Sequence, residues 1–116
     1  MDLVALLSTG KGSWVQVSGL IKTGEWDNIL LIGNESARKF EAGKSAEFVS
    51  ADLEKRMVPL KEELFEKLKG RVKGTEVALS IASGSGKEHM ALISALLQVP
   101  VGVRFVALTK EGIMFL

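Results

Sequence analysis

The chain contains short runs of apolar residues, and each run stops at residues that favour turns. Leu3–Leu7 is the first run, and it ends at Ser8, Thr9 and Gly10. A continuous apolar run of about four to eight residues bounded by turn residues is typical of a strand buried on both faces. Later segments have the same character, and they predict strands at Asn28–Ile32, Ala46–Val49, Glu76–Ala82 and Val103–Leu108.

Between these runs, apolar residues recur at helical spacing. The first such segment predicts a helix over Trp14–Thr23, and Ser13 and Gln16 at its start have the spacing of a capping box. Asp52 is expected to cap a second helix, and Pro59 is expected to kink or restart it. The apolar stripe of this helix consists of Leu53, Met57, Leu60, Leu64 and Leu68. Two further helices are predicted over Ser36–Ala42 and Lys87–Gln98.

The alternation of strands and helices predicts the fold class. Right-handed crossovers place successive strands in a parallel sheet that helices cover on both faces. The turn at Thr109–Gly112 predicts that Ile113–Leu116 returns antiparallel to the preceding strand. We therefore expect one domain over 1–116, a Rossmann-like three-layer α/β sandwich with a mostly parallel sheet and a C-terminal β-hairpin edge. The apolar segment Ile113–Leu116 fits an edge strand hidden in a dimer, or a strand tucked under a helix.

Composition narrows the classes of function. Lys and Arg number 15 against 14 Asp and Glu, so the net charge is +1 and non-specific nucleic-acid binding is not expected. The chain has no cysteine and one histidine, His89, so we expect no metal site and no cofactor held by cysteine or histidine clusters. Neither a signal peptide nor an apolar run of about 20 residues is present, which predicts a cytoplasmic protein without a membrane partner.

Two loops combine glycines, hydroxyl groups and a lysine directly before a predicted helix. The first contains Ser8, Thr9, Gly10, Lys11, Gly12 and Ser13, and the second contains Ser83, Gly84, Ser85, Gly86 and Lys87. Glycine lets backbone amides approach an anion, a helix start adds further N–H donors, and lysine supplies a charge. Ligands of open parallel sheets bind beyond the carboxyl ends of the strands, where the strand order reverses. The two loops therefore predict an anion-binding site, with Trp14 beside it to stack on a base.

The same residues have a plainer interpretation. Glycine and serine are ordinary turn residues between a strand and a helix, and Ser13 fits a helix cap. Glu88 is expected on the surface at a helix start, where the dipole favours a negative charge. Trp14 fits a hydrophobic lid over the sheet edge equally well. His89 has a pKa range suited to a general base, but it also fits a packing or hydrogen-bonding residue.

Two phosphate-binding motifs are excluded. A Walker A loop requires a glycine where Ile81 stands and a hydroxyl residue where Glu88 stands. A dinucleotide-binding fingerprint begins at Gly10 and Gly12, but Val15 occupies the position of its third glycine. Neither P-loop chemistry nor NAD binding is therefore expected.

The layout resembles the CARF domain, the CRISPR-associated Rossmann fold that senses cyclic oligoadenylates. The first strand runs into the hydroxyl-and-glycine loop Ser8-Thr9-Gly10, and a final strand and hairpin at Val103–Leu116 close the domain as in that family. The segment Ser83–Lys87 resembles the family's T-G-G-T-K signature. It departs from that signature at Ser85 and Gly86, which replace the second glycine and the second threonine.

The resemblance implies a homodimer in which both copies of each loop form one symmetric pocket for a ring of adenylates. Lys87 would bind phosphate or stabilise charge, while Ser8, Thr9 and Ser83 would hydrogen-bond to ribose or phosphate. Lys11 would lie at the rim. Stand-alone members resemble either simple binders or ring nucleases, in which a ribose 2′-hydroxyl attacks the adjacent phosphorus without a metal. Cleavage would use Lys87 and Ser83, and His89 is the one candidate for a general base.

Two alternatives remain open at this level. The chain also fits a Rossmann-like enzyme that acts on a small phosphorylated metabolite. It further fits a non-catalytic dimerisation or scaffold subunit in which the glycine loops are structural. Fold alone does not choose among these functions, because one fold hosts many of them.

Overall fold

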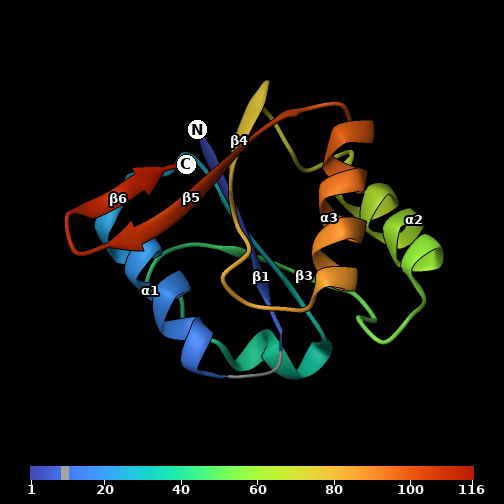
Figure 1. Cartoon of the computed structure of the whole chain (residues 1–116), viewed down its shortest axis with the longest axis horizontal. Helices are drawn as coiled ribbons and strands as arrows, with labels where there is room; N and C mark the ends of the chain where they lie inside the picture. Colours follow the sequence, from blue (N-terminus) through green and yellow to red (C-terminus); the bar gives the residue numbers. More distant parts are fainter. Residues whose placement is uncertain (9–10) are drawn as a thin grey trace.

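The protein folds around one mixed β-sheet. The structure, a computed structural model, describes residues 1–8 and 11–116. Its strands are β1 Asp2–Leu7, β2 Ile29–Gly33, β3 Glu47–Ser50, β4 Glu76–Ser80, β5 Gly102–Thr109 and β6 Gly112–Phe115. They form a six-stranded sheet in the order β3-β2-β1-β4-β5-β6. The first five strands are parallel, and β6 returns antiparallel to β5 as a hairpin (Figure 1).

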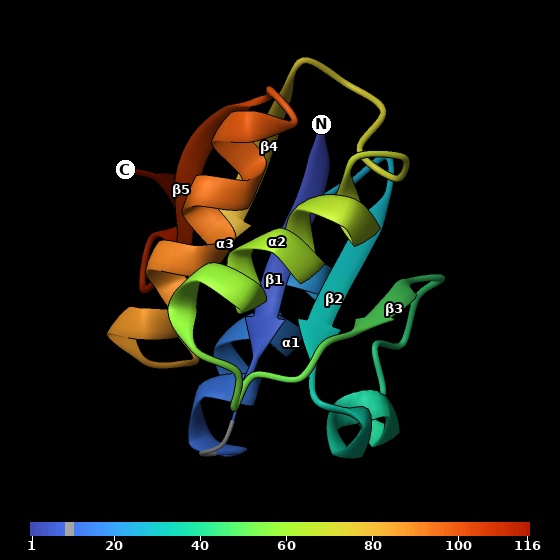
Figure 2. The same ribbon diagram turned by 90° about the vertical axis from the view of Figure 1, so that its right-hand side faces the viewer.

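Helices cover both faces of the sheet. They are α1 Trp14–Thr23, α2 Met57–Leu68 and α3 Gly86–Gln98. The helices α2 and α3 lie side by side on one face, and α1 lies behind the sheet on the other (Figure 2). Alternate residues of β1 enter two separate apolar cores, Val4 and Leu6 toward α2 and α3, and Leu3, Ala5 and Leu7 toward α1. The central strand is therefore apolar at almost every position, as the sequence predicts.

This arrangement confirms the predicted α/β sandwich with a mostly parallel sheet and an antiparallel hairpin. Two predicted helices differ in detail. The segment expected as a helix over Ser36–Ala42 is a 3₁₀ turn, Glu35–Lys39. The second helix begins at Met57, so Asp52 does not cap it. Pro59 lies in the first turn of α2, where a missing N–H costs no helical hydrogen bond. The proline therefore gives no reason for the kink that the sequence predicted.

The predicted capping box at Ser13 and Gln16 is wrong. Ser13 occupies the N-cap of α1, but its side chain makes no capping hydrogen bond. The Gln16 amide instead reaches β5, where it accepts from the N–H of Leu108 and donates to the carbonyl of Leu108 at 3.2 Å. Gln16 thus satisfies both main-chain groups of Leu108. The spacing of local residues did not reveal this contact, because its partner is 92 positions away.

None of the helices in the described part of the chain is long and apolar enough to cross a membrane.

Candidate functional site

The strand order reverses between β1 and β4, and both glycine-bearing loops follow these two strands. The chain passes from β1 to β2 on one side and from β4 to β5 on the other. The strands β1 and β4 are direct neighbours, with Ala5 paired to Ser80 near their carboxyl ends. In Figure 2 these ends lie at the lower edge, where the arrow of β1 points. The structure therefore brings the two loops together at the place where α/β sheets form a ligand crevice.

A hydrogen bond joins the first residues of the two loops. The N–H of Ser8 donates to Oγ of Ser83 at 2.8 Å, and both residues are buried. The backbone of Lys11, Gly12 and Ser13 forms a 3₁₀ turn that leads into α1. The predicted ligand residues Thr9 and Gly10 lie outside the described residues, as does the side chain of Lys11.

The second loop forms a complete capping box at the start of α3. Ser85 is the N-cap, its hydroxyl accepts from the N–H of Glu88, and the Glu88 carboxylate accepts from the N–H of Ser85 at 2.9 Å. Glu88 is 8% exposed. The expectation of a surface residue is therefore wrong, because the capping contacts hold its side chain inward.

The capping box leaves main-chain donors at the start of α3. Within residues 1–8 and 11–116, the N–H groups of Gly86 and Lys87 make no hydrogen bond. A Cβ added at Gly86 would meet no heavy atom within 4 Å, so space lies open beside these donors. Helix N-termini with free amides attract anions through both the N–H groups and the helix dipole.

Gly84 is required by its backbone conformation. Its φ is +106°, and an added Cβ would lie 2.4 Å from Cδ2 of Leu6. This position admits no side chain without a shift of the loop. The glycine of the predicted signature therefore has a steric reason that is independent of any ligand.

Lys87 does not lie with the first loop. Its ammonium donates to the carbonyl of Leu53 at 2.9 Å and to the carbonyl of Lys55 at 2.8 Å. Both acceptors belong to the segment between β3 and α2. The lysine therefore ties the start of α3 to that segment, and its phosphate-binding and catalytic roles stay predictions.

His89 and Trp14 hold the two loops from opposite sides. Nε2 of His89 lies 2.8 Å from the carbonyl of Ser83. A carbonyl only accepts, so Nε2 carries the proton in this contact. The indole N–H of Trp14 donates to the carbonyl of Ser8 at 2.8 Å, and its ring packs edge-on against Phe40 with centroids 5.8 Å apart. Both side chains support the loops whether or not they also contact a ligand.

Sequence reasoning missed one polar residue at this edge. Ser80, the last residue of β4, is fully buried, and its hydroxyl makes no hydrogen bond with any described group. It lies beside Ala5 of β1, three positions before Ser83 of the second loop. The sequence predicted a strand over Glu76–Ala82 with Ser80 inside it, and nothing in that pattern marked its hydroxyl as a functional group.

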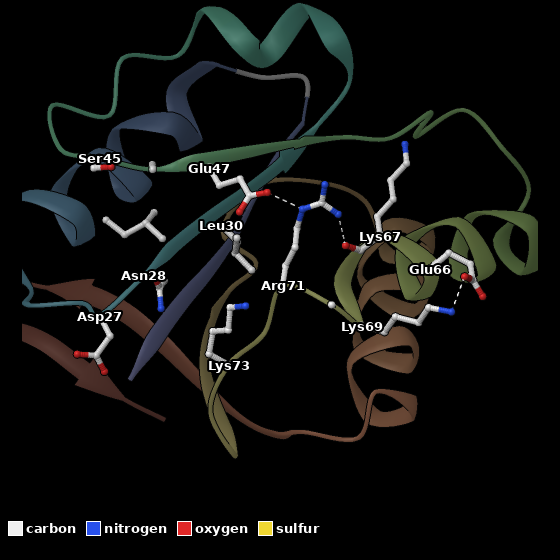
Figure 3. A pocket seen from close by; sticks show the side chains of 13 residues that line it. Asp27, Asn28, Leu30, Ser45, Glu47, Glu66, Lys67, Lys69, Arg71 and Lys73 are labelled. Carbon is white, nitrogen blue, oxygen red and sulfur yellow. Dashed lines mark hydrogen bonds and ion pairs between the residues drawn. The ribbon is translucent and has the colours of Figure 1, made fainter.

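A hollow of about 740 Å³ lies at the opposite, amino edge of the sheet (Figure 3). Its charged side chains come from Asp27 before β2, from Glu47 of β3, and from the end of α2 and the segment that follows it. Arg71 pairs with Glu47 at 2.5 Å, and Lys69 pairs with Glu66 at 2.7 Å. These pairs neutralise most of the lining, so this hollow presents much less free charge than its lysines suggest.

Comparison with known proteins leaves the family open. No family model matches the sequence, and a search of the curated proteins gives no match.

Proposed function

We propose that this domain binds the phosphate groups of a nucleotide, of the cyclic oligoadenylate class, at the carboxyl ends of β1 and β4. The observation that carries the proposal is the placement of both glycine-bearing loops at the strand-order reversal, joined by the contact between Ser8 and Ser83 at 2.8 Å. The nucleotide class comes from the resemblance of Ser83–Lys87 to the CARF signature. A phosphorylated metabolite bound at the same place is an outcome that the test below distinguishes.

The start of α3 supports the choice of an anion. The N–H groups of Gly86 and Lys87 are unpaired within the described residues, and the space beside Gly86 is open. The Lys87 ammonium lies on two carbonyls of the β3–α2 segment, so it adds positive charge near the helix start while it fixes that segment. Main-chain amides therefore make the direct contacts in this proposal.

The contacts of the candidate catalytic residues favour binding over cleavage. Nε2 of His89 already donates to the carbonyl of Ser83, which leaves that nitrogen unable to accept a proton. Ser83 uses its Oγ to accept from Ser8, and Lys87 donates to two carbonyls. All three side chains hold the protein's own backbone, which is the role of a binding scaffold.

The first test is a thermal-shift titration with cyclic tetra-adenylate, cyclic hexa-adenylate and a panel of common mononucleotides. A ligand at a hundred times its Kd adds about 2.7 kcal/mol to the free energy of unfolding, which raises the Tm visibly. Stabilisation by a cyclic oligoadenylate supports the proposal. Stabilisation by a mononucleotide alone would replace this ligand class, and no shift with either would overturn nucleotide binding.

A charge placed at the start of α3 tests the site itself. Gly86→Asp adds a carboxylate where the structure has open space, and an acidic residue in a first helical turn does not weaken the helix. We expect affinity for the stabilising nucleotide to fall at least about tenfold, because the carboxylate repels phosphate. Ser94→Asp adds the same charge on the exposed face of the same helix and serves as the matched control. Equal effects of both substitutions would exclude the start of α3 as the binding site.

A further inference from the structure

The strand β6 is an edge of the sheet that carries no charged side chain of its own. It ends the strand order, and the segment 112–116 contains neither a charged residue nor a proline. The other edge strand, β3, carries Glu47, which pairs with Arg71. Both edges have an arginine over a phenylalanine ring: the guanidinium of Arg38 lies 4.8 Å from the centre of the Phe48 ring on β3, and that of Arg104, from β5, lies 4.6 Å from the centre of the Phe115 ring on β6. Natural sheets often place charged residues on the edge strand itself, so an edge strand without a charge of its own needs another explanation.

The register shows which main-chain groups of β6 point outward. Leu116 donates its N–H to the carbonyl of Phe105 at 2.8 Å, and Met114 lies opposite Ala107. Hydrogen-bonded and non-hydrogen-bonded pairs alternate along an antiparallel ladder. Ile113 and Phe115 therefore occupy the non-hydrogen-bonded positions, and their N–H and C=O groups point away from β5.

The side chains of this edge are apolar and exposed. Met114 is 46% exposed, Phe115 38% and Leu116 81%. Phe105, which lies opposite Leu116 on β5, is 36% exposed and lines an apolar hollow of about 330 Å³ together with Leu116. Within residues 1–8 and 11–116, the edge thus offers unpaired backbone groups, and its apolar side chains lie on both faces of the sheet.

We propose that β6 pairs with β6 of a second copy of this chain, antiparallel across a two-fold axis that passes beside Met114. This register places Ile113 opposite the partner's Phe115, and each such pair exchanges two main-chain hydrogen bonds. A β-branched residue opposite an aromatic one is a favourable cross-strand pair. Leu116 lies opposite the partner's Gly112, whose lack of a side chain leaves room for it. The two sheets become one continuous sheet.

Self-complementarity is the reason to choose a second copy over a foreign strand. An isologous contact requires that the same surface serves both partners. In this register every outward group of Ile113 and Phe115 finds its match on the identical strand, and no like charges meet, because β6 has none. A short strand pair is a small interface, so we expect a reversible dimer with a Kd on the order of micromolar.

The test uses charge at the two-fold axis. Met114 faces its own copy there, and its exposure allows substitution without loss of the core. Sedimentation velocity of the unmodified chain from about 1 to about 500 µM should show a concentration-dependent dimer. Met114→Lys should shift the midpoint at least about tenfold higher, because two lysines then face each other. Leu97→Lys, at a residue that is 58% exposed on α3, should leave the midpoint unchanged.

Mixing separates this pairing from any other apolar association. Equal amounts of the Met114→Lys and Met114→Glu chains should restore the dimer, because opposite charges meet only if position 114 faces itself. Met114→Cys supplies a second readout, because the chain has no other cysteine. In the proposed pairing of β6 with β6, the two residues at position 114 form a non-hydrogen-bonded pair. The Cα atoms of such a pair lie about 4.5 Å apart, within disulfide range. Oxidation should link Met114→Cys dimers and not Leu97→Cys chains. A monomer throughout the concentration range, or no restoration on mixing, would overturn the proposal whatever the outcome of the nucleotide titration.

Discussion

Single polar residues at the carboxyl edge have structural partners that their sequence positions did not reveal. Lys87 follows a glycine at a helix start, which predicts phosphate binding, yet its ammonium donates to Leu53 and Lys55, more than thirty positions away. Ser85 and Glu88 have the spacing of a capping box and form one. The difference is physical: local hydrogen bonds depend on spacing along the chain, whereas the acceptors of Lys87 exist only after α2 and α3 have packed together.

Replacement of Lys87 tests this interpretation at the residue scale. Lys87→Met keeps the aliphatic stem but removes the donor from two carbonyls, so we expect a loss of about 1–3 kcal/mol in the free energy of unfolding without any ligand. Urea denaturation measures this loss as a lower midpoint with an unchanged slope. Lys110→Met, at the exposed hairpin turn, is the matched control and should lie within about 0.5 kcal/mol of the unmodified protein. Stability equal to that control would mean that the lysine is free for a ligand, as the sequence alone predicted.

At the scale of elements, the segment between β3 and α2 is held by lysines from two helices. Lys87 of α3 binds its carbonyls, and Lys67 of α2 donates to the carbonyl of Ser50 at the end of β3. Glu63 joins this arrangement through ion pairs with Lys67 at 2.7 Å and with Lys55 at 3.2 Å. The segment contains no regular element of its own, so these side chains determine its position beside the candidate site.

The same ion pairs make stability depend on pH. Burial raises the pKa of the Glu63 carboxyl, but hydrogen bonds from Lys67 and Lys55 outweigh it, and the pKa lies below its ordinary value of 4.5. The unfolded state therefore binds this proton more readily, so the stabilisation is present above pH 4.5 and is lost as the pH falls through the lower, folded pKa. The free energy of unfolding, measured by urea denaturation between about pH 7 and about pH 3, should therefore fall on acidification. We expect this fall to be about 1 kcal/mol smaller in Glu63→Gln than in the unmodified protein.

The neighbouring position provides the control for this titration. Glu62 is exposed on α2, and Glu62→Gln removes the same charge without touching the ion pairs of Glu63. Its pH profile should follow that of the unmodified protein. If both variants lost the same acid-dependent stability, the effect would come from net charge and not from the Glu63 contacts.

For the whole molecule, the hydrophobic pattern predicted the fold because each strand of a covered parallel sheet must be apolar on both faces. Leu3–Leu7 satisfies that demand residue by residue. The same pattern did not predict which distant polar groups meet, since contacts such as that of Gln16 in α1 with Leu108 in β5 depend on the order of strands in the sheet. The position of the candidate site followed from the general rule for α/β sheets. The role of each side chain in it depends on contacts between distant residues, which only the folded structure shows.

The strand order also determines how ligand binding and dimerisation are related. In the proposed β6 dimer, six strand spacings of about 4.8 Å separate the two reversals of strand order, roughly 29 Å. Each copy then binds its own nucleotide, with one ligand per chain. This differs from the pocket shared by two copies that the CARF resemblance implies. Separate sites predict no linkage between ligand binding and dimerisation, whereas a shared pocket predicts positive linkage.

Sedimentation equilibrium with and without a saturating nucleotide distinguishes them. Separate sites leave the dimer Kd unchanged, because a ligand that contacts only one copy has equal affinity for monomer and dimer. A shared pocket requires that the nucleotide tightens the dimer by the same factor by which dimerisation tightens the nucleotide. We expect no change in the dimer Kd and the same nucleotide affinity in the monomeric Met114→Lys chain. A dimer strengthened by nucleotide at one ligand per two chains would instead place the interface at the carboxyl edge, beside the loops of β1 and β4.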